Sequence, residues 1–156
     1  MIYVTGDTHG CFGRFEDLML YKTPMTREDY VIVLGDFGGI WDNEKFTLLD
    51  KENAVLDALT RKPFTILFID GNHENFDRLY EFPVEEWHGG KIHKIRENIF
   101  HLMRGEIFDI ENKKFFVFGG AASHDIEDGI ITMDNDGEWI EKVAELRKYG
   151  QNRFRI

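Results

Sequence analysis

Short apolar runs alternate with amphipathic segments through the first half of the chain. Runs of β-branched and aromatic residues predict buried strands over Ile2–Thr5, Tyr30–Leu34 and Phe64–Ile69. Between them, apolar side chains recur at helical spacing, which predicts helices over Phe12–Tyr21 and Glu44–Arg61. Strands that are apolar throughout and are separated by helices are typical of βαβ units, so we expect an α/β fold with a mainly parallel sheet.

The second half has a different pattern, with shorter apolar runs that lie closer together. We expect four strands in this part, over Lys91–Arg96, Ile99–Met103, Glu106–Ile110 and Phe115–Phe118. Turn residues separate them, which favours antiparallel hairpins or a meander. A last helix is predicted over Glu138–Tyr149, whose apolar residues share one face. The whole pattern predicts a single domain over residues 1–156.

Composition and charge narrow the class of protein. Apolar residues make up 42% of the chain and charged residues 31%, which is typical of a globular protein rather than a disordered one. Lys and Arg number 19 against 29 Asp and Glu, so the net charge is −10. A surface this acidic repels phosphate backbones, and we do not expect tight binding to nucleic acid.

The sequence also bears on the compartment. No apolar run approaches the roughly 18 residues that a membrane-spanning helix needs, and the first residues do not have the pattern of a signal peptide. Cys11 is the only cysteine, which excludes an intrachain disulfide and suits a reducing environment. We therefore expect a cytoplasmic protein that does not bind membranes. We also expect Cys11 to be a small buried thiol.

Residues with metal-binding side chains follow each of the three predicted parallel strands. The segments after these strands are GDTHG at residues 6–10, GDFGG at residues 35–39 and DGNHE at residues 70–74. The carboxyl ends of parallel strands meet at one edge of a sheet, where ligands bind in open α/β folds. We therefore expect five side chains to lie close together: Asp7, His9, Asp36, Asn72 and His73.

These side chains carry the oxygen and imidazole nitrogen atoms that divalent first-row metal ions accept as ligands. Asp7 and His9 are two residues apart, so in an extended segment both can bind the same ion. Asp36 has two oxygens that can bridge two ions, Asn72 offers its amide oxygen, and His73 is placed to donate to a phosphoryl or leaving oxygen. Each motif alone also has a simpler interpretation, since Asp and Gly are common in turns and Asn72 can cap the helix that follows.

Together the three motifs resemble those of the calcineurin-like metallophosphoesterase family, and GDTHG, GDFGG and GNHE match its pattern within residues 1–75. The resemblance implies a mixed β-sheet sandwich flanked by helices, and hydrolysis of phosphate esters by two-metal catalysis. It implies a first metal ion bound by Asp7, His9 and Asp36. It also implies that Asp36 bridges to a second ion held by Asn72, and that His73 stabilises charge or protonates the leaving group.

The family pattern continues with a histidine after a later strand and a Gly-His-x-His motif, and we identify neither in this sequence. We expect His93 and His101 to be half-buried packing residues or surface residues, and His88 to lie in a loop. We expect the segment around His124 to lie near the rim of the site. The fold is accordingly expected to lack the C-terminal strands, as in a truncated chain or a naturally short relative.

The missing histidines predict two unequal metal sites. The first keeps Asp7, His9 and Asp36, and we expect it to hold a divalent ion such as Mn, Fe, Zn, Ni or Co. The second keeps only Asp36 and Asn72 and is expected to be weak or empty unless a second chain completes it. Missing strands leave an unpaired sheet edge, which favours a homo-oligomer.

Two functions fit these observations. The first is metal-dependent hydrolysis of a phosphorylated substrate, whose class the sequence leaves open, and the alternative is a catalytically inactive metal- or phosphate-binding scaffold of the same fold. A nucleotide-binding Rossmann domain fits the alternation of elements, but no glycine-rich dinucleotide or P-loop motif follows the first strand. We expect the Phe-rich strand Phe115–Phe118 to belong to the core rather than to form a base-stacking surface.

Overall fold

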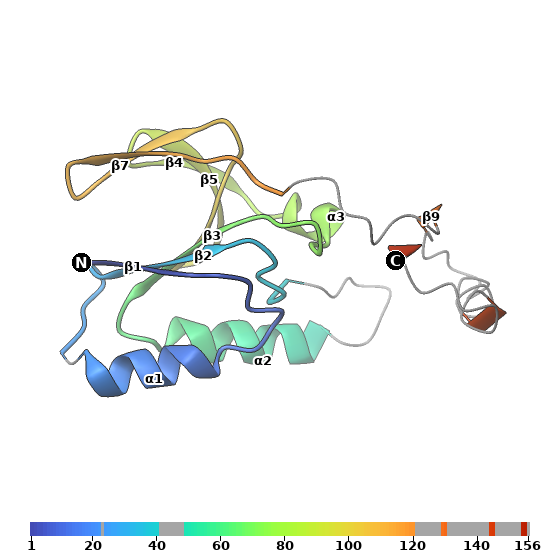
Figure 1. Ribbon diagram of the computed structural model, residues 1–156, viewed down its shortest axis with the longest axis horizontal. Helices are drawn as coiled ribbons and strands as arrows, with labels where there is room; N and C mark the ends of the chain where they lie inside the picture. Colours follow the sequence, from blue (N-terminus) through green and yellow to red (C-terminus); the bar gives the residue numbers. More distant parts are fainter. Residues whose placement is uncertain (23, 41–48, 121–128, 131–143, 146–153, 156) are drawn as a thin grey trace. The chain divides into compact units, whose positions relative to one another are not determined.

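A computed structural model describes residues 1–22, 24–40, 49–120, 129–130, 144–145 and 154–155 of the chain. The chain forms two compact units, Met1–Ala121 and Ala122–Ile156. The first unit contains the main sheet, the helices that pack on it and the candidate site (Figure 1). In the second unit, β9 (Gly129–Ile130) and β10 (Phe154–Arg155) pair in parallel.

A six-stranded mixed sheet forms the centre of the first unit, in the order β1-β2-β3-β6-β5-β4. Its parallel part contains β1 (Ile2–Thr5), β2 (Tyr30–Leu34), β3 (Thr65–Ile69) and β6 (Ile99–Leu102). Its antiparallel part adds β5 (Gly90–Arg96) and β4 (Val84–Trp87). A separate antiparallel hairpin contains β7 (Ile107–Ile110) and β8 (Lys113–Phe116).

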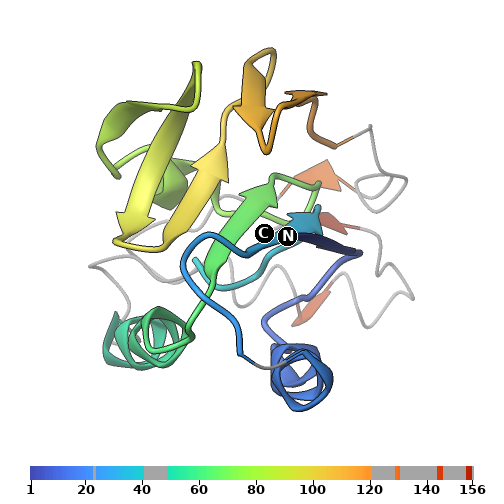
Figure 2. The ribbon, with the colours of Figure 1, turned by 90° about the vertical axis from the view of Figure 1, so that its left-hand side faces the viewer.

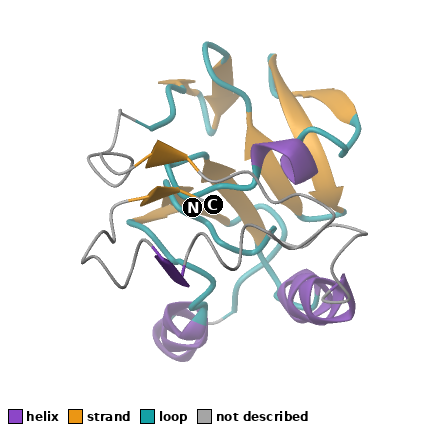
Figure 3. Cartoon of the chain, turned by 90° about the vertical axis from the view of Figure 1, so that its right-hand side faces the viewer, coloured by secondary structure: helices purple, strands orange, loops and turns teal. Residues whose placement is uncertain are grey.

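Helices and the hairpin pack on opposite faces of the main sheet (Figure 2). The two longer helices are α1 (Gly13–Tyr21) and α2 (Leu49–Thr60), and both lie on the same side of the sheet in Figure 3. A single short turn of helix, α3 (Phe76–Leu79), follows the loop after β3. Among the described residues, no helix has both the length and the apolar character needed to cross a bilayer.

The alternation of side chains along the central strands divides the core into two clusters. In β2, Val31 and Val33 pack in the cluster that contains Phe15 of α1, while Ile32 packs in the cluster that contains Phe108 of β7. Since both faces are covered, the central strands are apolar at nearly every position, as the sequence pattern predicted.

The large mixed sheet flanked by helices confirms the predicted fold class. β1 and β2 have the predicted bounds, and β3 begins one residue later than predicted. The last predicted strand of the hairpin region is displaced, because Glu111 and Asn112 form its turn with φ angles of 50° and 60° and pairing resumes at Lys113.

Some elements differ from the prediction or could not be foreseen. Most of β4 is exposed, so it has little apolar signal, and α3 is too short to show a helical period. The first residues of the helix predicted over Glu44–Arg61 lie outside the described residues. So does most of the helix predicted over Glu138–Tyr149, of which residues 144 and 145 are described and are helical.

Candidate metal centre

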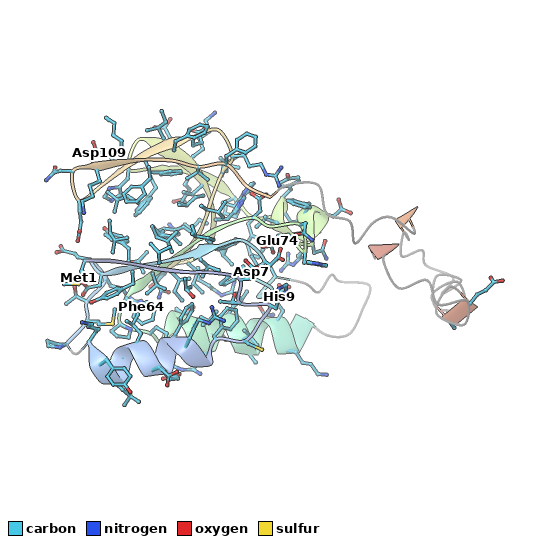
Figure 4. The ribbon with its side chains drawn as sticks, in the orientation of Figure 1. Met1, Asp7, His9, Phe64, Glu74 and Asp109 are labelled. Carbon is cyan, nitrogen blue, oxygen red and sulfur yellow. The ribbon has the colours of Figure 1, made fainter. Side chains whose placement is uncertain are left out.

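The three predicted motifs meet at the carboxyl ends of β1, β2 and β3. These strands are parallel and in register, with Thr5 opposite Val33 and Leu34 opposite Ile69, so their loops leave the sheet at the same edge. Asp7 and His9 lie close together, and Figure 4 shows them, with Glu74, at this end of the sheet. The βαβ topology thus brings together residues that are far apart in the sequence.

Asp7, His9 and Asp36 form a cluster of candidate metal ligands, and one ligand atom from each lies within 4.8 Å of the others. Nε2 of His9 is 3.8 Å from Oδ2 of Asp7 and 3.7 Å from Oδ2 of Asp36. These distances are too long for hydrogen bonds. They suit atoms that share an ion, because ligands about 2.1 Å from one metal ion lie roughly 3–4 Å apart.

The cluster has a buried base and an open side. Asp36 is only 5% exposed, whereas the side chains of Asp7 and His9 are 52% and 57% exposed. A buried carboxylate needs partners that replace water. Two carboxylates and one imidazole that face a common space are a donor set suited to a divalent ion, so these residues fit such a metal.

Backbone hydrogen bonds join the first loop to the second. The carbonyl oxygen of Asp36 accepts from the N–H groups of Thr8 at 3.1 Å and His9 at 2.8 Å. The carbonyl oxygen of Phe37 accepts from the Gly10 N–H at 3.0 Å and from the Thr8 hydroxyl at 2.7 Å. These bonds fix the backbone on both sides of His9 against the backbone that carries Asp36.

Two of the predicted ligands have an unusual backbone conformation. His9 and Asp36 have φ angles of 45° and 42°, in the left-handed region that residues other than glycine rarely adopt. Such conformations cost free energy and persist where the surrounding structure holds them, most often at functional sites. The backbone hydrogen bonds between the two loops provide that support.

The third loop contacts Asp36 directly. The N–H of His73 donates to Oδ1 of Asp36 at 2.8 Å, which leaves Oδ2 as the oxygen nearest to Nε2 of His9. A Cβ atom at Gly71 would lie 1.9 Å from the same Oδ1, so only glycine allows this approach. The rings of His9 and His73 lie 5.7 Å apart, measured between their centroids.

Glu74 also joins the second and third loops. Its carboxyl group is buried and accepts from the N–H of Phe37 at 2.8 Å and of Gly71 at 3.4 Å. Burial raises the pKa of Glu74 to about 7, although both hydrogen bonds favour the charged form. The sequence motif contains Glu74, but its role depends on contacts with Phe37, which is 37 residues away.

Asn72 lines one cavity together with Asp7 and Asp36. The alternative role considered for it, capping the following helix, belongs to Asn75, whose side chain accepts from the N–H of Arg78 at 3.1 Å. The structure therefore places all five predicted site residues at the same edge of the sheet. Three of them form the ligand cluster, Asn72 lines the adjoining cavity, and His73 contacts Asp36.

A buried polar network that the sequence did not indicate lies behind the third loop. The carboxylate of Asp70 accepts from Nε2 of His101 at 3.0 Å and pairs with Arg104. Nδ1 of His101 lies 3.0 Å from Nδ1 of His93, so one of these two ring nitrogens donates to the other. Burial alone would raise the pKa of Asp70, but the bonds from His101 and Arg104 hold it below its ordinary value.

This network corrects the expectation that His93 and His101 are half-buried or at the surface. Both are buried, at 3% and 2% exposure, because each satisfies the other and His101 is bonded to Asp70. Cys11 was expected to be buried, but it is exposed. Its N–H closes a tight turn by donating to the carbonyl of Thr8. His88 lies in a turn, as predicted, and His124 lies outside the described residues.

The expectation that Phe115–Phe118 belongs to the core is also wrong in part. Val117 is buried and Phe115 is partly buried, but Phe116 and Phe118 are 65% and 71% exposed. Neighbouring side chains of an extended segment point to opposite sides, so every second residue faces away from the core.

The fold and the ligand cluster define an α/β protein with a candidate divalent-metal site at the ends of three parallel strands. A family model described as calcineurin-like phosphoesterase matches residues 1–153. The chain therefore belongs to the calcineurin-like phosphoesterase family, as its motifs predicted. Comparisons with curated proteins and with solved structures gave no match.

Proposed function

We propose that this protein is a metal-dependent hydrolase of phosphate esters. One observation carries the proposal: Asp7, His9 and Asp36 place ligand atoms within 4.8 Å of one another in a chain of the calcineurin-like phosphoesterase family. The family supplies the general chemistry, and the cluster supplies a place for it in this chain.

In this proposal Asp7, His9 and Asp36 hold a first divalent ion, and Asp36 with Asn72 holds a second and weaker one. The larger donor set and the buried position of Asp36 support the unequal affinities. Mn, Fe, Zn, Ni and Co all accept carboxylate and imidazole ligands. When bound, such ions polarise a phosphoryl group and lower the pKa of water.

The chain itself positions these groups and stabilises charge. The N–H of His73 fixes one oxygen of Asp36, so the other oxygen keeps its orientation toward His9. The His73 ring is near that of His9, where an imidazole can donate to a phosphoryl oxygen or protonate the departing oxygen. Asp36 is therefore proposed as a ligand and His73 as a catalytic residue.

The proposal is tested on the full chain by calorimetric titration with Mn²⁺ and by hydrolysis of p-nitrophenyl phosphate. Asp36→Asn is expected to abolish tight Mn²⁺ binding and hydrolysis together. His73→Gln is expected to lower turnover by about 10²–10⁴-fold, the usual contribution of a positioned acid or base, while the Mn²⁺ affinity changes little. Mn²⁺ binding without hydrolysis of any phosphate ester would contradict the proposal and support the inactive scaffold.

A further inference from the structure

The ligand cluster opens into a cavity of about 360 Å³ whose lining is divided by chemistry. Asp7, Asp36, Asp70 and Asn72 supply polar groups, and the other large side chains are apolar. The apolar wall, as we call it, consists of Leu34, Ile69 and Phe118. None of these lining residues, all in the described part of the chain, is basic.

The apolar wall is more exposed than a folding role requires. Leu34 and Ile69 are the paired last residues of β2 and β3, and Leu34 is 50% exposed. Phe118 is 71% exposed, and its ring is stacked on that of Phe116 at a centroid distance of 6.3 Å. Apolar side chains that lie together at the surface and are rimmed by polar groups are one mark of a ligand-binding groove.

Contacts at the end of the third strand hold Phe118 in place at this cavity. The N–H of Gly120 donates to the carbonyl of Asp70 at 3.0 Å, and a Cβ atom at Gly119 would lie 2.4 Å from an Asp70 carboxylate oxygen. The Asp70 carboxylate is itself held by His101 and Arg104. The segment that carries Phe118 is therefore fixed against the same loop that carries Asn72.

The charge of the lining limits what the apolar wall can accept. A substrate with further phosphates or carboxylates would face Asp7 and Asp36 with no basic lining residue to offset the repulsion, since the charge of Asp70 is already paired with Arg104. The volume suits a small molecule: a phosphoryl group together with one group of the size of a ring. A flat apolar group would gain the most binding free energy in this cavity, because it can stack on the exposed ring of Phe118.

We propose that the apolar wall is a subsite for the ester group of the substrate, and that it selects phosphate esters carrying an uncharged planar ring. This inference rests on the proposed function, since it names the substrate class of the same site. Hydrolysis breaks the bond between phosphorus and the ester oxygen. Water supplies the hydroxyl group to phosphorus and a proton to the departing oxygen.

The test compares esters with and without a ring in the wild type and in variants of Phe118. The full chain with Mn²⁺ is assayed on phenyl phosphate, adenosine 5′-monophosphate and glycerol phosphate. Phe118→Ala is expected to lower kcat/KM for a ring-bearing ester by about tenfold, which is a typical loss for a stacked aromatic contact. The same variant is expected to change kcat/KM for glycerol phosphate by less than about twofold. Because each ester is compared with itself, differences in leaving-group reactivity cancel.

Two variants serve as controls. Phe118→Tyr keeps the ring and is expected to keep the preference. Tyr21→Ala removes a ring that is 82% exposed on α1 and does not line the cavity, so it is expected to change none of the three rates. If Phe118→Ala lowers kcat/KM for phenyl phosphate alone, the subsite accepts a ring bonded directly to the ester oxygen. If it also lowers kcat/KM for adenosine 5′-monophosphate, the subsite accepts a ring that is joined to the ester oxygen through a sugar. An equal loss on all three esters would overturn the inference.

A binding measurement separates this inference from the proposed function. Phenylphosphonate and methylphosphonate are not hydrolysed, so their affinities for the chain with Mn²⁺ are measured by calorimetry without turnover. Tighter binding of phenylphosphonate that is lost in Phe118→Ala supports the subsite even if no ester is hydrolysed. Equal affinities in the wild type would overturn the subsite even if the protein is an active hydrolase.

Discussion

Asp36 joins the three loops of the candidate metal centre. Its carbonyl oxygen accepts from Thr8 and His9 of the first loop, and its carboxylate accepts from His73 of the third. Its buried position and its left-handed φ angle mean that few other residues could take its place. The orientation of this one side chain depends on how closely the third loop approaches it.

Gly71→Ala tests that dependence at the scale of a residue. The new methyl group would lie 1.9 Å from Oδ1 of Asp36, so the carboxylate or the third loop must move. We expect at least a tenfold loss of Mn²⁺ affinity and a loss of stability of about 1–3 kcal/mol, as for other overpacked sites. Calorimetry and thermal unfolding measure the two effects.

Gly13→Ala is the matched control for Gly71→Ala, because a Cβ atom there meets nothing within 4 Å. It begins α1, where alanine is favoured over glycine, so we expect unchanged affinity and slightly higher stability. Equal Mn²⁺ affinity in Gly71→Ala and the wild type would show that the third loop does not position Asp36.

At the scale of elements, the buried histidine pair connects the antiparallel part of the sheet to the site. His93 of β5 faces His101 of β6, whose other ring nitrogen reaches Asp70 after β3. The ring of Tyr80, which follows α3, lies 5.6 Å from that of His93. Burial, and then the neighbouring His101, lower the pKa of His93 below its ordinary value of 6.5, so the folded protein binds a proton there at a lower pH than the unfolded chain does.

The pair predicts a loss of stability in acid. Between the ordinary pKa of 6.5 and the lower pKa of the folded state, the unfolded chain binds a proton at His93 that the folded chain does not bind. The contribution of His93 to the free energy of unfolding therefore falls as the pH drops through this value, by up to about 1.4 kcal/mol per pH unit. Glu74, whose folded pKa of about 7 lies above its ordinary 4.5, contributes a slope of the opposite sign between these two values, so the His93 slope is the difference between the wild type and His93→Gln. This slope is measured by urea unfolding at several pH values between about 7.5 and 5.5, the range in which histidine ordinarily titrates.

Two variants test whether His93 causes this pH dependence of the free energy of unfolding. His93→Gln keeps a hydrogen-bond donor and is expected to be less stable at neutral pH but to lose this part of the pH dependence. His88→Gln removes an exposed imidazole and is expected to keep the full slope. A wild-type slope that persists in His93→Gln would show that the buried pair is not its cause.

The same elements show what could be predicted from the sequence. The strands β1, β2 and β3 were predicted because residues buried on both faces form continuous apolar runs that end at glycine. The parallel pairing of β6 with β3, and the burial of His93 and His101, depend on partners that no local pattern reveals. Likewise, Asp70 and Glu74 stand beside the predicted ligands, but their roles come from residues about thirty positions away or more.

At the scale of the whole molecule, the sheet order supports the proposal of a homo-oligomer. Among the strands in the described part of the chain, β1 lies at the edge of the main sheet, and its Val4 is 58% exposed. An exposed edge strand can pair with that of a second chain. We expect light scattering of the full chain to give twice the mass of one chain, and Val4→Lys to reduce it to one. A wild-type mass equal to that of one chain would contradict the proposal.

Asp7, His9 and Asp36 are proposed to hold a divalent metal ion. The most direct measurement is the anomalous scattering of a crystal of the full chain soaked in Mn²⁺. We predict a strong peak in contact with all three side chains, at the distances of about 2.0–2.2 Å that such ligands adopt, and a weaker peak beside Asn72. The absence of a peak between the three side chains would contradict the claim, and two full-occupancy peaks held by this chain alone would contradict the unequal sites.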